Sequence, residues 1–291
     1  MTEQNLVIKP LTAPLGAEID GIDLAAPIDD VTFDHLHAAW LEHKVLFFRN
    51  QELTPEQHKA FARRFGDFQP PGFVPTLPDH PEIRFQEQPS KSGIEANIVW
   101  HSDDLFLEVP SKGSILWAID VPEKGGDTVW VDMELAYEDL SHTMKGLLAG
   151  LTALNVPMAN MREVVNMFGV DAFARMVKRS KPVEHPVVKT HPETGHTSLN
   201  INELNTTQIV GMTTKESDSL LRFLFDHSQQ PDFQCRFSWR KGSAAFWDNR
   251  CTMHRGLPNF TRGHRLMHRV AIADSQAPAY APSRQAGGAS A

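Results

Sequence analysis

A His-x-Asp pair and a distant histidine are the residues of this chain best suited to chemistry. His101 and Asp103 lie two positions apart, and His254 follows 151 residues after Asp103. Two imidazoles and one carboxylate can bind a non-haem Fe(II) ion on one face and leave the opposite positions open for a co-substrate and dioxygen. If the pair lies on a strand, both side chains project to the same side and can reach one metal ion. Such a triplet also arises by chance, so each residue could equally be an ordinary surface or core side chain.

The composition is that of a globular protein with ample material for a core. The chain has 291 residues, of which 41% are hydrophobic and 22% are charged. The formal net charge is 28 − 36 = −8, which argues against nucleic acid as a partner. Two cysteines, Cys235 and Cys251, are too few for a disulfide scaffold. Residues 1–9 lack a signal-peptide pattern and no apolar run has membrane-spanning length, so we expect a cytoplasmic protein with no membrane partner.

The domain organisation is expected to be simple. No internal repeat or Gly/Ser linker divides the chain, which favours a single domain over residues 1–274. Residues 275–291 are rich in Ala, Pro, Gly and Ser, so we expect a largely disordered tail there. We expect the protein to form a homo-oligomer.

Capping patterns predict the helices. Thr54–Gln57 and Thr213–Glu216 each have the spacing of a capping box, and Gly66 is suited to end the first of these helices. Two more helices are expected over residues 29–44 and 141–150.

Short apolar runs between polar or Pro/Gly-rich segments predict strands. They begin early, are interrupted by a helical stretch and resume near the C-terminus, which predicts a closed β sandwich or barrel decorated by helices, mainly β with α. Residues 192–195 (Pro-Glu-Thr-Gly) are typical of a turn between two strands. This topology could bring His254 beside His101 and Asp103. The expected strands are residues 45–48, 114–121, 128–132, 187–190, 243–247 and 269–273.

Several motifs occur in an order that resembles one enzyme family. The chain resembles the taurine/2,4-D-type (TauD/TfdA) branch of the Fe(II)/2-oxoglutarate dioxygenases, from about Leu15 to Asp274. The resemblance implies a double-stranded β-helix (jelly-roll) core, with Fe(II), 2-oxoglutarate as co-substrate and O2 as the cofactors. The motifs are Trp100-His101-Ser102-Asp103, Gly125-Gly126-Asp127-Thr128, His185-Pro186-Val187-Val188, Thr190-His191-Pro192, Trp247-Asp248-Asn249-Arg250 and Arg265-Leu266-Met267-His268-Arg269.

The same resemblance implies roles for individual residues. His101, Asp103 and His254 match the iron ligands. Arg265 matches the arginine that binds the distal carboxylate of 2-oxoglutarate, a task suited to a planar guanidinium fork. Thr128 matches a hydroxyl donor to that carboxylate, although an ordinary strand threonine would give the same pattern.

The substrate contacts follow from neighbouring positions. Arg269 lies four residues after Arg265, so both leave the same face of an extended strand. It matches the position that binds the anionic group of the substrate, and Asn97 matches a substrate-contacting asparagine of the taurine enzymes. Asp104 is an unusual neighbour of a ligand; it could face an amine or another cationic group on the substrate, or be a solvated loop carboxylate.

Two departures from the taurine enzymes concern the substrate pocket. Those enzymes carry a histidine soon after an Arg-Phe-Gly motif, whereas here no histidine follows residues 64–66 until His80. Phe68 or Phe73 could instead line an apolar pocket, or simply pack. The methionine-rich segment Met158–Ser180 could form a lid or pack as a helical stripe.

The resemblance implies hydroxylation of a small organic anion, coupled to decarboxylation of 2-oxoglutarate to succinate and carbon dioxide. The anion could be a sulfonate, a sulfate ester or a carboxylate such as an aryloxyalkanoate, and the hydroxylated product could collapse to release sulfite, an aldehyde or a phenol. An amino-acid-like or cationic substrate is the alternative within the family. A zinc hydrolase could use the same ligands without Arg265 or Thr128, and a non-catalytic jelly-roll protein would leave the ligand set unexplained.

Overall fold

The computed structural model describes most of the chain. The helices are α1 (Asp30–His43), α2 (Pro55–Arg63), α3 (Met133–Glu138), α4 (His142–Leu148) and α6 (Thr214–Ser228), with a 3-10 helix η1 (Pro231–Phe233). The strands are β1 (Val7–Pro10), β2 (Ala17–Asp20), β3 (Val45–Phe48), β4 (Thr76–Leu77), β5 (His80–Pro89), β6 (Ser111–Asp120), β7 (Thr128–Asp132), β8 (Thr152–Asn155), β9 (Val183–Pro186), β10 (Val188–Thr190), β11 (Thr197–Leu199), β12 (Thr206–Ile209), β13 (Gln234–Phe237), β14 (Ala244–Asp248), β15 (Thr252–Gly256) and β16 (His264–Ala273). The described residues are 6–12, 14–72, 75–89, 99–157, 165, 169–171, 174, 178, 181–257, 259–260 and 262–281.

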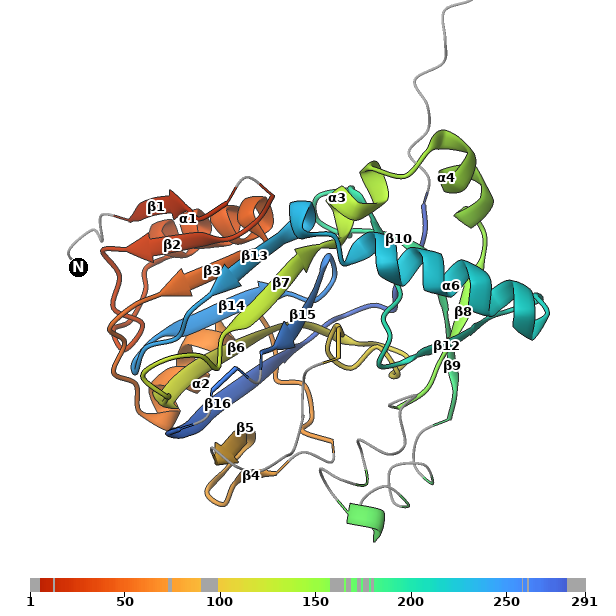
Figure 1. Ribbon diagram of the computed structural model, residues 1–291. Coiled ribbons are helices and arrows are strands. Elements are labelled where there is room, and N and C mark those ends of the chain that lie inside the picture. The colour runs from red at the N-terminus through yellow and green to blue at the C-terminus, as the bar shows by residue number, and fades with distance from the viewer. Residues whose placement is uncertain are drawn as a thin grey trace, which may run out of the picture.

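Two sheets form the jelly-roll core that the sequence predicts. The larger sheet has the strand order β1-β2-β3-β14-β6-β16-β5-β4, and the smaller one has the order β13-β7-β15. Their facing side chains form one apolar cluster. In it, the Phe47 ring stacks on the Phe237 ring with centroids 4.2 Å apart and packs edge-on against the Trp130 ring with centroids 5.3 Å apart. Strands far apart in the chain thereby lie side by side, as Figure 1 shows for β7 and β15.

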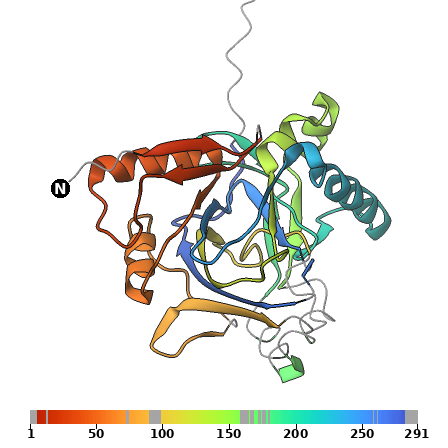
Figure 2. The ribbon, with the colours of Figure 1, turned by 60° about the vertical axis from the view of Figure 1, so that its left-hand side comes forward.

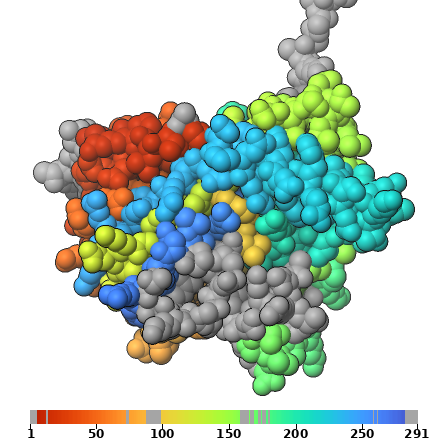
Figure 3. Space-filling view, viewed as in Figure 1, coloured from red at the N-terminus to blue at the C-terminus, as the bar shows by residue number. Residues whose placement is uncertain are grey.

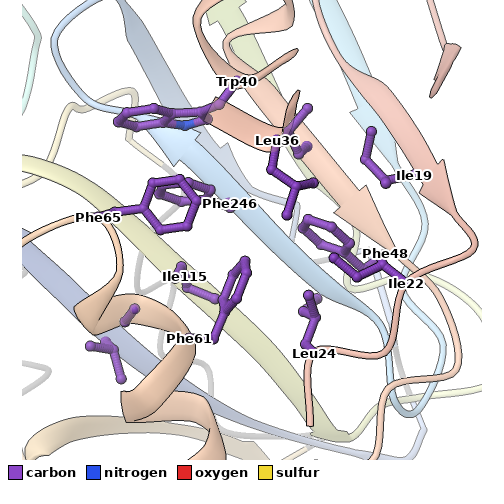
Figure 4. Packing of buried hydrophobic residues seen from close by; sticks show 14 of the residues in the cluster. Ile19, Ile22, Leu24, Leu36, Trp40, Phe48, Phe61, Phe65, Ile115 and Phe246 are labelled. Atoms are coloured by element: carbon purple, nitrogen blue, oxygen red, sulfur yellow. The ribbon is translucent and has the colours of Figure 1, made fainter. Parts of the chain in front are cut away.

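Helices α1 and α2 cover the outer face of the larger sheet (Figure 2). The Trp40 ring from α1 stacks on Phe246 of β14 with centroids 4.4 Å apart, and Phe61 and Phe65 close the cluster from the side of α2 (Figure 4). The Thr54 hydroxyl accepts from the Gln57 amide at 3.2 Å and the Gln57 side chain accepts from the Thr54 amide at 2.8 Å, which is the expected capping box. Burial of these rings fixes the sheet against its helices.

A second layer of helices lies at the other end of the molecule. In α6, the side chains of Leu221 and Leu224 are buried in a cluster with α3 and β11, while the opposite side of the helix is on the surface (Figure 3). Among the described helices none is long and apolar enough to cross a membrane. The second capping box, at Thr213, starts α6 as the sequence predicts.

The local predictions were mostly confirmed. All four expected helices are present as α1, α2, α4 and α6, and each expected strand overlaps an observed one. The expected turn at residues 192–195 joins β10 to β11. Helix α3 was missed because six residues are too few to show a helical period, although Asp132 caps it by accepting from the amides of Glu134 and Leu135.

The beginning of the expected tail follows β10 along the surface. The Thr190 amide donates to the Ala279 carbonyl at 2.8 Å, and the Thr190 hydroxyl donates to the Ala281 carbonyl at 2.9 Å. This part of the predicted disordered segment is therefore hydrogen-bonded to the rest of the protein. Residues 282–291 lie outside the described residues.

The buried His58 of α2 makes the stability of the fold depend on pH. Its Nε2 lies 3.2 Å from the Ile115 carbonyl, which can only accept, so the neutral ring donates from Nε2. Burial lowers the pKa of His58 to about 3, so the unfolded chain takes up a proton near pH 6.5 and the folded chain does not. Stability from this group is therefore present above pH 6.5 and is lost as the pH falls from 6.5 towards 3. Between pH 7 and pH 5 the wild-type free energy of unfolding should fall by about 2 kcal/mol more than that of His58→Gln.

Urea unfolding of both proteins at the two pH values measures this difference. His35→Gln is the matched control, because it makes the same substitution at an exposed position of α1. An equal pH dependence in His58→Gln and the wild type would contradict the assignment to His58.

Candidate active site

The three predicted metal ligands come together in the structure. His101 forms an isolated β-bridge with His254 of β15, in which the His101 amide donates to the His254 carbonyl at 3.0 Å and the His254 amide donates back at 2.7 Å. Asp103 Oδ1 lies 4.0 Å from Nε2 of both imidazoles. One ligand atom from each residue lies within 4.8 Å of the others, and all three residues are buried. Residues far apart in the chain thus form one compact N, N, O group.

The reason for the His-x-Asp spacing differs from the one predicted. His101 is in the bridge, but Asp103 already lies in a turn, so the pair does not share a regular strand. The chain reverses at Asp104, whose φ of +59° is in the left-handed region that aspartate tolerates better than most residues. The Leu107 amide donates to the Asp104 carbonyl at 2.9 Å and closes this turn. The turn, and not strand alternation, directs the Asp103 carboxylate towards the imidazoles.

Polar neighbours hold the Asp103 carboxylate in place. The Ser114 hydroxyl donates to Oδ2 at 2.9 Å, and Asn249 accepts from the Asp103 amide through Oδ1 at 3.3 Å. Asn249 is itself fixed, because Trp247 Nε1 donates to Oδ1 at 2.9 Å and Asn249 Nδ2 donates to the Ser111 hydroxyl at 3.0 Å. Partners of this kind orient a metal ligand. The sequence gives no indication of a role for Ser114 and indicates Asn249 only as part of a motif.

The protonation states suit metal binding. His101 Nδ1 lies 2.8 Å from the Val99 carbonyl and must donate to it, so the Nε2 lone pair is free and faces Asp103. Burial lowers the pKa of His101 and of His254, which keeps both rings neutral. Burial alone would raise the pKa of Asp103, but the charge of the Arg269 guanidinium outweighs it and the carboxylate stays ionised. Two neutral imidazole nitrogens and an ionised carboxylate around one point fit a divalent cation such as Fe(II).

Arg265 presents a buried positive charge close to the turn at Gly126. Its side chain is buried on β16, its Nε donates to the Gly126 carbonyl at 3.3 Å, and no carboxylate of the described residues forms an ion pair with it. Burial lowers the pKa of Arg265 to about 10, partly opposed by Asp127, whose own ion pair is with Arg236. A guanidinium that remains charged at neutral pH without a counter-ion has the donors to bind a carboxylate bidentately.

Thr128 is placed to complete such a site. It is buried at the start of β7, and its Oγ1 accepts from the indole nitrogen of Trp239 at 2.9 Å. Because the indole supplies the donor, the Thr128 hydroxyl hydrogen is available for an incoming acceptor. Gly125 and Gly126, with φ of +82° and +70°, form the turn before β7, and a Cβ at Gly125 would lie 2.3 Å from the Asn259 carbonyl oxygen. This turn needs glycine.

Arg269 lies on the same buried side of β16 as Arg265, as the spacing predicts. Its Nη1 donates to Asp103 Oδ1 at 2.6 Å, while its Nε is buried with no hydrogen-bond partner among the described residues. On the neighbouring strand β5, Arg84 is the direct register partner of Arg269. No sequence motif indicates Arg84, because only strand pairing brings it to the site.

Asp104 lies beside a cation of the protein. Its Oδ2 is 3.6 Å from Arg84 Nη1, and Arg84 Nη2 donates to the Pro70 carbonyl at 2.9 Å. Burial lowers the pKa of Arg84, and Asp104 opposes that shift. The Asp104 carboxylate is therefore matched by a guanidinium at this site, and the local charge around Asp103 is set by two arginines and two aspartates.

Some predicted residues lie outside the described part of the chain. They include Asn97, Phe73 and most of Met158–Ser180. Phe68 is among the described residues and is partly buried. The Arg63 guanidinium carbon lies over the Phe68 ring, 3.8 Å from the centroid of that ring.

A second cluster of possible ligands is structural. His191, Asp248 and Cys251 also have one ligand atom each within 4.8 Å of the others. His191 Nδ1 accepts from the amides of Glu193 and Thr194, so Nε2 carries the hydrogen and donates to Asp248 at 3.1 Å. Arg250 occupies both oxygens of Asp248, and burial raises the pKa of the Cys251 thiol well above its usual range. These groups already satisfy one another and hold the turn that carries Asn249.

Comparison with known proteins identifies the family and agrees with the fold. A family model described as "Taurine catabolism dioxygenase TauD, TfdA family" matches residues 8–271. The chain belongs to this family. An alkylsulfatase from Acinetobacter baylyi is 35% identical over 277 residues, covering 93% of this chain and 86% of that protein.

Two further proteins support the same assignment. An (S)-phenoxypropionate/alpha-ketoglutarate-dioxygenase from Sphingobium herbicidovorans is 33% identical over 276 residues, covering 93% of this chain and 96% of the relative. The solved structure of AAD-2 in complex with Mn(II) and N-oxalylglycine superposes with a TM-score of 0.79 at 27% identity and covers 94% of this chain and all of that one. The protein described here is therefore an alpha-ketoglutarate-dependent dioxygenase of the TauD/TfdA family, which uses Fe(II), 2-oxoglutarate and O2.

Proposed function

We propose that this dioxygenase hydroxylates a small organic anion at the carbon that bears a sulfate ester or aryl ether oxygen. His101, Asp103 and His254 hold the metal, and Arg265 with Thr128 bind the distal carboxylate of 2-oxoglutarate. Bound Fe(II), with 2-oxoglutarate and O2, supplies the oxidising chemistry, in which succinate and carbon dioxide are formed. The residues of the chain bind and orient both substrates and keep the site buried.

The proposal that the substrate is an anion rests on the buried Arg269 Nε. This donor has no acceptor among the described residues and belongs to a guanidinium whose other end is fixed by Asp103 Oδ1. A substrate anion held at Nε would lie beside the metal ligand without replacing it. Charge-assisted hydrogen bonds from a fixed guanidinium give both affinity and orientation.

The anionic class of substrate is favoured over a cationic one. Asp104, the residue that could face an amine, already forms an ion pair with Arg84 at 3.6 Å, although its Oδ2, like Arg269 Nε, makes no hydrogen bond among the described residues. The relatives point the same way, since one is named for alkyl sulfates and another for phenoxypropionate. The absence of a histidine between Gly66 and His80 also separates this chain from the pattern of the taurine enzymes.

Hydroxylation at such a carbon leads to cleavage. The product carries a hydroxyl group and a sulfate or aryloxy group on one carbon. When the hydroxyl proton leaves, a carbonyl forms and the bond from carbon to the sulfate or aryl ether oxygen breaks. A sulfate ester thus yields an aldehyde and inorganic sulfate, and an aryloxyalkanoate yields a keto acid or aldehyde acid and a phenol. Cytoplasmic location and assembly as a homo-oligomer are part of the same proposal.

Succinate formation tests the reaction and the substrate class together. The Fe(II)-loaded protein is incubated with 2-oxoglutarate alone and with hexyl sulfate, 2-phenoxypropionate or taurine. We expect hexyl sulfate or 2-phenoxypropionate to stimulate succinate formation, with sulfate or phenol released in equal amount. Stimulation by taurine alone, or by none of the three, would contradict the proposed class of substrate.

Substitution of Arg269 tests the role of its side chain. Arg269→Gln should raise the KM for the stimulating anion by about 10–150-fold, as expected for loss of a hydrogen bond to a charged group. The KM for 2-oxoglutarate should change far less. Titration with Mn(II) serves as the control, because Arg269 also contacts Asp103 and a general disturbance of the site would weaken metal binding. Equal changes in both KM values would contradict the assignment.

A further inference from the structure

A cavity of about 310 Å³ lies behind the turn that carries Asn249. Its inner wall includes Ser111 and Asn249, and its outer wall is the segment 276–281 that Thr190 binds. None of the predicted metal ligands lines it, and neither Arg265 nor Arg269 does. The cavity is therefore separate from the sites assigned above to the metal, 2-oxoglutarate and the substrate anion.

The ammonium group of Lys189 is the unmatched charge of this cavity. Lys189 lies on β10, lines the cavity and is only 8% exposed. Among the described residues its ammonium makes no hydrogen bond and no ion pair, and the nitrogen keeps some accessible surface where the side chain lines the cavity. Burial lowers the pKa of Lys189 to about 8, opposed by the Asp248 carboxylate, so the group is still mostly protonated at pH 7. An ammonium that is largely withdrawn from water, faces a cavity and has no acceptor among the described residues favours an anion as its partner.

The other charged groups of the wall are already engaged. The Arg250 guanidinium donates to Asp248 and to Glu193. His191 Nδ1 accepts within its own turn, and His191 Nε2 donates to Asp248. Asp274 accepts from the Ser275 amide at 2.7 Å and forms no ion pair with Lys189. Lys189 is thus the wall group whose charge is left to bind a ligand.

The remaining wall is largely apolar. Pro110, Pro192, Ala277, Pro278 and Ala279 line it. Such a surface offers few hydrogen bonds to a fully polar ion and favours contact with hydrocarbon. We propose that this cavity binds a small organic carboxylate, with the carboxylate at Lys189 and a short apolar chain against the prolines and alanines. This inference does not depend on the identity of the enzyme's substrate.

Hexanoate is the probe for this site. Calorimetric titration of the full chain, in the presence of saturating Mn(II) and N-oxalylglycine, should show one hexanoate bound per chain. Lys189→Met should weaken this binding about tenfold or more, since it removes the charged donor. Lys189→Arg keeps the charge and should retain binding. Lys215→Met is the matched control, because Lys215 is exposed on α6, and it should leave the affinity unchanged.

Folding and specificity are checked with the same proteins. Replacement of an unpaired buried ammonium by an apolar side chain of similar length should not lower the thermal midpoint. Asp274→Asn removes the wall carboxylate and should strengthen hexanoate binding by about 1.5- to 5-fold. Absence of binding to the wild type would overturn the proposal, and so would unchanged binding to Lys189→Met, because the anion would then be held at the arginines of the active site.

Discussion

Asp103→Asn is expected to lose stoichiometric binding of divalent metal and, with it, succinate formation. The substitution keeps the size of the side chain but removes the ionised oxygen that lies 4.0 Å from each imidazole nitrogen. Changes in the residues that merely orient a ligand cost 10–100-fold in affinity or activity, so loss of the ligand itself should cost about a hundredfold or more. Mn(II) titration followed by calorimetry measures the affinity, and succinate formation measures turnover.

Two matched variants define what the Asp103 result means. Ser114→Ala removes one hydrogen bond to Asp103 Oδ2 and should have a smaller effect, of about 10–100-fold. Asp139→Asn changes an exposed carboxylate on the surface and should bind metal as the wild type does. If Asp103→Asn folds and binds Mn(II) with unchanged affinity, Asp103 does not belong to the ligand set.

Local sequence patterns predicted the elements well because the interactions that start them are local. The Thr54 and Thr213 capping boxes each involve residues three apart, and the structure has both. Strand β16 was predicted only from Arg269 onward, because His264, Arg265 and His268 interrupt the apolar pattern. Two of the polar residues of this strand, Arg265 and Arg269, face the buried side and bring charge to the site. The pattern was weakest where the strand carries functional residues.

The contacts around the ligands could not be predicted from spacing. Asn249 lies 146 residues from Asp103, and Arg84 meets Arg269 through the register of β5 against β16. The motif at residues 247–250 indicated that Asn249 was important without showing what it touches. The pairing of Arg269 with Asp103 was equally hidden, because a side chain assigned to bind a substrate anion can also reach an aspartate of its own chain.

The same physical feature links the co-substrate site to the proposed second cavity. Arg265 and Lys189 are both buried cations without an ion-pair partner in the described part of the chain, and burial lowers the pKa of each. Unmatched buried charge costs stability and is retained where a ligand completes the site. The metal centre differs, because there the charge of Asp103 is already balanced in part by Arg269.

Arg265→Met is expected to bind 2-oxoglutarate far more weakly and yet to be as stable as the wild type or more stable. Removing one partner of a buried, hydrogen-bonded charge pair costs about 2–5 kcal/mol, which corresponds to a rise in the KM for 2-oxoglutarate of about 30- to 5000-fold. Without ligand the same guanidinium has no counter-ion among the described residues, so an apolar side chain of similar length removes a desolvation cost. Kinetics and thermal unfolding are measured on the same preparation, with Arg262→Met on the exposed loop before β16 as control. An unchanged KM would remove Arg265 from the co-substrate site, and a large loss of stability would show that the arginine serves the fold instead.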